Sequence, residues 1–179
     1  MCIRTTLNGD VVEIQGPACS GKSQLCLFFS MTTALAATWE VEIIPPHRAP
    51  RRDSIELGGK AKSVIVFDTD GRFDVSRLAG MVEAHLRRRI EEYTKTVPYF
   101  YGGHASSDEI EKEVQATLKR IHVFRPGNMW SLAVGLQRLP KYVRELPGEE
   151  VALVLVDSIS AFYWQNKVLL LSLALKKAD

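Results

Sequence analysis

The feature that most constrains this chain is a glycine-rich segment near its N-terminus, residues 16–23, which reads GPACSGKS. It matches the pattern GxxxxGK[ST] and lies between a short β-branched run, residues 11–15, and an apolar run, residues 22–37. We predict a strand before the segment and a helix after it that is buried on most sides. In that context the pattern forms a phosphate-binding loop. The alternative interpretation is a chance glycine turn.

Each part of the segment has a role in phosphate binding. Gly16 and Gly21 let backbone N–H groups close around phosphate oxygens, and the start of the helix adds positive potential. Lys22 would neutralise the outer phosphates, and the Ser23 hydroxyl would ligate Mg²⁺. The residues between the glycines, which would line the loop, are Pro17, Ala18, Cys19 and Ser20. The segment therefore predicts a site for a nucleotide and a magnesium ion.

The rest of the chain alternates apolar runs with amphipathic ones. We expect strands buried in a parallel sheet at residues 63–67, 121–124 and 151–156. We expect helices at residues 75–93, 107–118 and 129–139. Ser106 and Glu109 have capping-box spacing at the start of the second helix, and Pro140 should end or restart the third. This order predicts a single α/β domain with a mostly parallel sheet.

Residues 45–60 break both periodicities with prolines, paired arginines and paired glycines. We predict a long loop there.

Acidic residues follow two of the predicted strands. Asp157 closes the last strand, where a carboxylate can hold Mg²⁺ through water, although it could also be a helix cap, as Ser158 could be. Asp68 and Asp70 follow another strand, so they should reach the same edge of the sheet, where open parallel sheets bind ligands. One of them could orient an attacking water. The alternative is that both cap the local turn.

Composition limits the function classes. The chain is 46% apolar and 25% charged, as in ordinary globular proteins, and its formal net charge of +2 is too small to indicate nucleic-acid binding. Cys2, Cys19 and Cys26 form no CxxC pair and are odd in number, which favours a reducing compartment, and they show no zinc-site spacing. The sequence predicts no membrane span and no secretory signal.

These motifs together resemble the ATPase core of RecA-type recombinases, and in particular their eukaryotic paralogues. The resemblance is carried by residues 9–23, 64–78 and 151–165. It implies a RecA-like P-loop NTPase core over residues 1–165, incomplete at its C-terminal end, with an unmatched basic loop near residues 45–57. Residues 166–179 do not resemble the family and form a divergent tail.

The resemblance implies binding of ATP and Mg²⁺ and assembly with other recombinase paralogues. The family supports homologous-recombination repair of DNA breaks in the nucleus. Gly16, Gly21, Lys22 and Ser23 would hold the phosphates and metal, and Asp157 the metal. Arg77 matches an arginine that would stack on adenine. DNA would be bound through the complex and weakly by the chain alone, and no membrane would be involved.

Two departures from the family pattern change the expected activity. The water-activating glutamate of active recombinases is replaced by Asp70, which draws the carboxylate back by ~1.5 Å, and a misplacement of about 1 Å can cost ~100-fold in rate. We therefore expect slow or absent hydrolysis. Only 22 residues follow Asp157. We therefore expect a truncated form that lacks the family's later strands and DNA loops, and also its preceding helical domain.

Two other hypotheses remain. The chain could be an independent P-loop ATPase or phosphotransferase that uses the same loop. It could also be unstable alone, because the truncation would remove a central strand.

Overall fold

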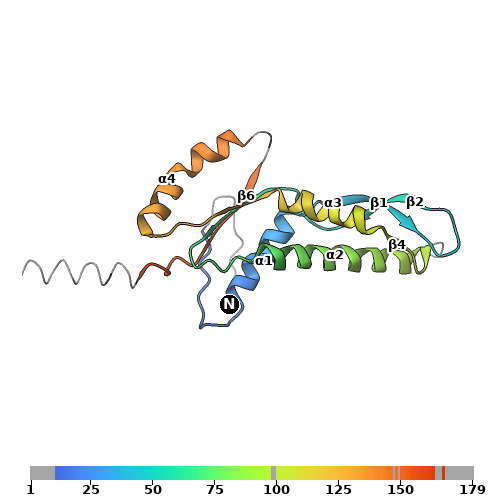
Figure 1. Cartoon of the computed structure of the whole chain (residues 1–179), viewed down its shortest axis with the longest axis horizontal. Coiled ribbons are helices and arrows are strands. Elements are labelled where there is room, and N and C mark those ends of the chain that lie inside the picture. The colour runs from blue at the N-terminus through green and yellow to red at the C-terminus, as the bar shows by residue number, and fades with distance from the viewer. Residues whose placement is uncertain (1–10, 98–99, 147, 149, 164–166, 168–179) are drawn as a thin grey trace, which may run out of the picture.

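The computed structural model describes residues 11–97, 100–146, 148, 150–163 and 167. It is a mixed α/β structure, elongated along α2, with α4 at the opposite end (Figure 1). Its helices are α1 (Lys22–Ala34), α2 (Val75–Thr96), α3 (Ser107–Leu118) and α4 (Met129–Glu145). Its strands are β1 (Thr38–Ile44), β2 (Arg51–Glu56), β3 (Ser63–Asp68), β4 (His104–Ala105), β5 (Ile121–Phe124) and β6 (Val151–Asp157).

A parallel sheet with the strand order β5-β3-β6 forms the centre. Every residue of β3 is buried, as its continuous apolar sequence predicted. Val64 and Val66 pack in a cluster with residues of α1, α2 and α3, whereas Ile65 and Phe67 pack in a second cluster with α4. Helices therefore cover both faces of β3, and the prediction of a parallel sheet is confirmed.

A second, antiparallel sheet with the order β2-β1-β4 corrects the prediction of a loop over residues 45–60. β1 and β2 form a hairpin that is closed by residues 45–50. Val41, Ile43 and Ile55 are buried, while the charged residues of β2 lie mostly at the surface. Strand β2 is stabilised by pairing with β1 and by the burial of Ile55. The proline- and arginine-rich sequence indicates neither of these contributions.

The predicted strand at residues 11–15 is wrong. This segment belongs to neither sheet, and Val11 is 96% exposed. Because a strand gains stability from its neighbours, a β-branched run with no strand beside it among the described residues stays outside the ladder.

Helix α1 is shorter and less buried than predicted. It ends at Ala34 rather than near residue 37, because Leu35 turns to an extended conformation and its N–H bonds Met31 O at 2.9 Å. Phe28 is 46% exposed, so the helix is buried along one side rather than on most sides.

The other helices begin as predicted. The carboxylate of Asp74 accepts the N–H groups of Ser76 and Arg77 at the start of α2, and Ser106 caps α3 by accepting from Glu109 N. Helix α4 continues through Pro140, which corrects the predicted end. Leu139 and Tyr142, which lie on either side of the proline, pack in the second cluster with Ile65 and Phe67. This packing offsets the hydrogen bond that the proline cannot donate.

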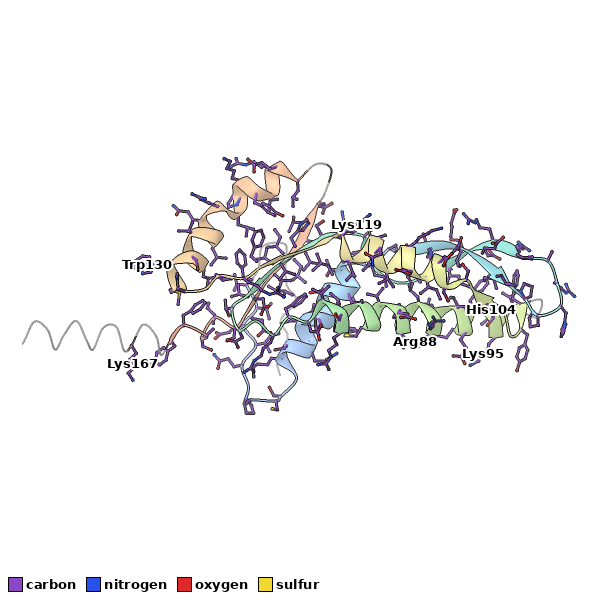
Figure 2. All side chains as sticks on the ribbon, in the orientation of Figure 1. Arg88, Lys95, His104, Lys119, Trp130 and Lys167 are labelled. Atoms are coloured by element: carbon purple, nitrogen blue, oxygen red, sulfur yellow. The ribbon has the colours of Figure 1, made fainter. Side chains whose placement is uncertain are left out.

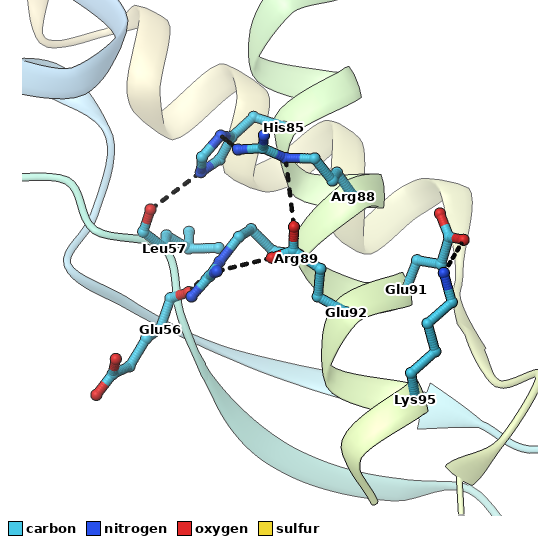
Figure 3. Close-up of polar contacts among 8 residues, drawn as sticks. All are labelled: Glu56, Leu57, His85, Arg88, Arg89, Glu91, Glu92 and Lys95. Carbon is cyan, nitrogen blue, oxygen red and sulfur yellow. Dashed lines mark hydrogen bonds and ion pairs between the residues drawn. The ribbon is translucent and has the colours of Figure 1, made fainter.

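Polar contacts fasten the end of β2 to the middle of α2 (Figure 3). Arg89 Nε donates to Glu56 O at 2.7 Å, and a ring nitrogen of His85 lies 3.0 Å from Leu57 O. Further along, the Tyr93 hydroxyl donates to Asp53 at 2.7 Å. The hairpin is thus attached to α2 at three successive points.

The tryptophans differ in their surroundings. Trp39 is buried in the core, whereas Trp130 is 78% exposed at the start of α4 and points away from the sheet (Figure 2). Trp164 lies outside the described residues, as do residues 168–179 of the divergent tail. Within the described part of the chain, no helix combines the length and apolarity that crossing a bilayer requires.

Candidate functional site

The glycine-rich loop has a backbone that depends on its glycines. Gly21 has a φ of 87°, a conformation that side chains rarely adopt, and Cys19 has a φ of 62°. A Cβ added at Gly16 would lie 2.8 Å from Ser20 Oγ. A side chain at Gly21 would therefore strain the turn, whereas one at Gly16 would require the Ser20 side chain to move.

Lys22 extends back into the loop from the first residue of α1. Its ammonium donates to the carbonyl oxygens of Gly16 and Pro17 at 2.8 and 2.7 Å. It also lies 3.3 Å from Ser20 Oγ. The positive charge of this side chain is thus held inside the turn.

The start of α1 is suited to an anion. Gly21 is its N-cap and provides no side-chain acceptor, and the first turn contains no acidic residue. The N–H groups at a helix start lack intrahelical partners and carry the positive end of the helix dipole. Ser23 lies in this turn and is half-buried. A phosphate at this position would meet backbone donors, the Lys22 ammonium and the Ser23 hydroxyl.

Two carboxylates lie at the carboxyl edge of the parallel sheet, Asp157 at the end of β6 and Asp70 after β3. Thr69 joins the two strand ends, because its N–H donates to Asp157 O at 2.9 Å and its hydroxyl to Ser158 O at 2.6 Å. The Ser158 hydroxyl lies 3.4 Å from Asp70 Oδ2. The topology thus brings Asp70 to the end of β6, as the sequence predicted.

Cys26 connects this edge to α1. Burial, with a smaller contribution from the negative charge of Asp157, raises the pKa of the Cys26 thiol to about 11. Helix α1 itself packs on β6 and β3. The glycine-rich loop and the carboxylates consequently belong to one region of the molecule.

Asp68 has a structural role at the same edge of the sheet, where it lies in register with Asp157. Its side chain is buried and accepts from Arg72 N at 2.9 Å and from Arg125 Nε at 3.1 Å. Both of its oxygens therefore already have a protein partner, and a role of Asp68 toward an attacking water stays a prediction. Sequence reasoning overlooked Arg125, although its position directly after β5 placed it at the same edge of the sheet.

Arg77 lies in the first turn of α2 with an exposed side chain, and its backbone N–H donates to Asp74 at 3.1 Å. Its role toward adenine stays a prediction.

These residues fit the phosphates of a nucleotide and a magnesium ion. The loop provides a glycine turn, a lysine and uncapped N–H groups, which is the donor set that phosphates require. No group of three or more metal-ligating side chains occurs among the described residues. Mg²⁺ is usually bound by one or two carboxylates together with water and phosphate oxygens, and the protein ligands here would be the Asp157 carboxylate and the Ser23 hydroxyl.

No protein-family model matches the chain. Among curated proteins, it is 29% identical to the DNA repair protein XRCC2 homolog of Arabidopsis thaliana over 89% of this chain and 43% of that protein. It is 28% identical to the DNA repair protein RAD51 homolog 2 of Mus musculus, over 86% and 33% of the two chains. It is 24% identical to the DNA repair protein XRCC2 of Mus musculus, over 90% and 44%.

The chain spans less than half the length of these curated relatives. The similarity nevertheless covers most of the chain. It confirms the resemblance to RecA-type recombinase paralogues that the motifs carry, and in particular to XRCC2, X-ray-repair cross-complementing protein 2.

Proposed function

We propose that this chain is an ATP-binding recombinase-paralogue subunit that supports homologous-recombination repair of DNA double-strand breaks in the nucleus. The observation that carries the proposal is the glycine turn of residues 16–21 closed around the Lys22 ammonium, at a helix start that lacks acidic residues. The relatives, which are named as DNA repair proteins, support the biological role.

Gly16, Gly21, Lys22 and the loop between them would bind the phosphates of ATP. Ser23 and Asp157 would hold Mg²⁺, and Arg77 would stack on adenine. The bound ion would supply positive charge that offsets the charge of the phosphates. This chain's own residues would bind and orient the nucleotide, because the loop already has its turn conformation.

The chain would act mainly as a nucleotide-dependent assembly factor. ATP would shift the population toward a conformation that docks another recombinase paralogue. Asp70 would place its carboxylate too far back for efficient activation of water, so hydrolysis would be slow or absent. DNA would be bound through the complex, and only weakly by this chain, whose net charge is +2.

Calorimetry with ATP and Mg²⁺ tests the binding step. We expect saturable binding by the full chain that weakens by at least about 10-fold in Lys22→Ala, because a hydrogen bond to a charged group contributes ~1.5–3 kcal/mol. The matched control is Lys60→Ala, which removes an exposed lysine outside the loop and should leave affinity unchanged. Folded protein that takes up no ATP would refute the proposal.

Turnover and DNA binding separate the alternatives. Rapid ATP hydrolysis by the purified chain, abolished in Lys22→Ala, would favour an independent ATPase or phosphotransferase instead. A submicromolar, salt-dependent affinity of the chain alone for single-stranded DNA would contradict the assignment of DNA binding to the complex.

A further inference from the structure

The tip of the β1–β2 hairpin, residues 45–52, is a basic and stiff segment. It reads PPHRAPRR and contains three arginines, a histidine and no acidic residue. Its three prolines restrict the backbone. Residues 46–52 are exposed, and the hairpin tip lies at the end of the molecule opposite α4 (Figure 1). The proposed nucleotide site uses none of these residues and leaves the hairpin tip without a role.

Two of the arginines line one pocket. The pocket has a volume of about 280 Å³ and is lined by Pro45, Arg48, Ala49, Arg51 and Phe100. Among the described residues, its lining contains no carboxylate. The Arg51 guanidinium lies 5.9 Å from the centre of the Phe100 ring, and this cation–π contact holds its charge beside the pocket. An anion in the pocket would therefore meet guanidinium groups above an apolar wall.

The third arginine of the hairpin tip is neutralised within the fold. Arg52 donates to Glu109 Oε1 at 2.8 Å, and the other oxygen of Glu109 accepts from Glu42 N at 2.9 Å. Arg52 also lies opposite Glu42 in the register of the hairpin. Its charge is therefore offset on two sides, and the charge that a ligand could use is carried by the arginines of the pocket.

The ion pair of Arg51 is weak by comparison. Its side chain is 70% exposed, and its Nε lies 3.9 Å from Asp53 Oδ2. The same Asp53 oxygen accepts the Tyr93 hydroxyl at 2.7 Å, so this carboxylate is already engaged by α2. Exposed ion pairs contribute little because water screens them. A ligand can therefore take over the Arg51 guanidinium at small cost.

The chemistry of the pocket suits the phosphates of a DNA backbone. Guanidinium groups are planar forks of donors that match phosphate oxygens. A DNA strand carries one phosphate for about every 3.4 Å of helix axis, so two neighbouring arginines can be engaged at once. The prolines lower the cost of ordering the segment on binding. The relatives are named as DNA repair proteins, which favours DNA over an acidic protein as the partner.

We propose that the hairpin tip is a DNA-contact site at which Arg48 and Arg51 bind the phosphate backbone without reading the base sequence. The choice of partner rests on the proposed role in DNA repair, but the contact does not require ATP, because the glycine-rich loop contributes nothing to it. A contact through two arginines is weak alone. It adds to the DNA affinity of the complex and orients this chain on the DNA.

Fluorescence anisotropy with labelled DNA tests the contact. The full chain is titrated into a duplex and a single strand of the same sequence, from about 50 to 200 mM salt, where we expect a micromolar or weaker Kd. Arg48→Ala/Arg51→Ala should raise the Kd at least about 10-fold at the lower salt. Because each phosphate contact contributes about 0.9 to the salt slope on duplex and about 0.7 on single strands, the slope should fall by ~1.8 or ~1.4. The strand form that shows the larger loss is the one that the hairpin tip prefers.

Two control variants separate a specific contact from general charge. Arg138→Ala/Arg144→Ala removes the same two charges from exposed positions of α4, at the other end of the molecule, and should change the Kd less than about 2-fold. Arg48→Lys/Arg51→Lys keeps the charges and should stay within about 3-fold of the unmodified chain. Far-UV circular dichroism and calorimetry with ATP, measured on every variant, show whether the fold and the nucleotide site are retained.

Several outcomes would overturn the proposal. They are no DNA binding even at the lower salt, equal losses in the hairpin and α4 alanine variants, and a loss in the lysine variant as large as in the alanine one. If poly-glutamate displaces the labelled DNA as well as unlabelled DNA does, the hairpin tip binds acidic proteins instead. A chain that fails these tests but still binds ATP loses the hairpin contact and keeps the proposed nucleotide site.

Discussion

At the scale of single residues, the glycine-rich loop is closed on its own lysine. The Lys22 ammonium bonds two carbonyl oxygens of the loop, which stabilises the turn without a ligand. A phosphate would offer the ammonium a charged acceptor instead, and charge-assisted hydrogen bonds are stronger than neutral ones. Binding would therefore exchange partners at Lys22 rather than build the loop anew.

Cys19 would report on the proposed nucleotide binding, because it lies inside the loop. It is exposed, so maleimide should modify it readily, and ATP with Mg²⁺ at ten times the dissociation constant should slow the reaction about 10-fold. Cys26 should react slowly with or without ATP, because burial raises its pKa to about 11 and keeps the thiol protonated. Mass spectrometry of the two peptides measures both rates. Protection of Cys19 that persists in Lys22→Ala would count against this interpretation.

Asp70 allows binding and hydrolysis to be separated. Its carboxylate lies 3.4 Å from the Ser158 hydroxyl at the end of β6. Asp70→Glu extends the carboxylate by one methylene group, so we expect ATP turnover to rise by roughly 10–100-fold while ATP affinity stays within about 2-fold. Phosphate release and calorimetry measure the two quantities. Asp108→Glu, the same change at an exposed position of α3, is the control. Equal changes in turnover and affinity would defeat the idea.

At the scale of secondary-structure elements, β2 depends on α2 for its position. The bond from the Tyr93 hydroxyl lowers the pKa of Asp53 below its ordinary 3.8, and the same bond raises the pKa of Tyr93 above its ordinary 10.0. Both shifts mean that the bond is strongest between an ionised Asp53 and a neutral Tyr93. The contact therefore stabilises the hairpin most at neutral pH.

Tyr93→Phe should lower the free energy of unfolding by about 1 kcal/mol at pH 7. Because the folded pKa of Asp53 is lowered, its contribution is present above pH 3.8 and is lost as the pH falls through the folded pKa. Because the folded pKa of Tyr93 is raised, its contribution is fully present below pH 10.0 and is lost as the pH rises through the folded pKa. Urea unfolding across pH should show this window. Tyr101→Phe, at an exposed tyrosine, is the control, and a difference independent of pH would exclude the mechanism.

Elements whose own sequence carries the signal were predicted correctly, whereas elements that depend on distant partners were not. The central strand β3 and the helix α2 were predictable, because burial on both faces leaves a continuous apolar run and burial of one helix stripe leaves a periodic pattern. Strand β2 was not, because it is held by pairing with β1 rather than by its own composition. Residues 11–15 show the reverse error, a strand-like run that has no strand beside it in the part of the chain that the structure describes.

The candidate site divides in the same way. The loop and Lys22 were predictable, because all of their parts lie within eight consecutive residues. The engagement of Asp68 by Arg125 was not, because the two are separated by 57 positions and meet only when β3 and β5 pair.

At the scale of the whole molecule, one apolar cluster joins the two sheets. It contains Val41 and Ile55 of the antiparallel sheet together with Val64 and Val66 of the parallel one. Because these side chains share one core, we expect the β1–β2 hairpin and the parallel sheet to unfold together. Cooperative unfolding of the isolated chain would also argue against the hypothesis that it is unstable alone.

Ile55→Ala tests this coupling. Truncating a buried isoleucine costs roughly 2–5 kcal/mol, and Ile55 lies in β2, far along the chain from the glycine-rich loop. If the molecule is one cooperative unit, native-state hydrogen exchange should speed up by the same factor in β2 and in β3, about 100-fold for a loss of ~3 kcal/mol. Val134→Ala at the surface of α4 should leave both rates nearly unchanged. Faster exchange confined to β2 would mean that the hairpin unfolds separately and that the parallel sheet keeps the nucleotide site without it.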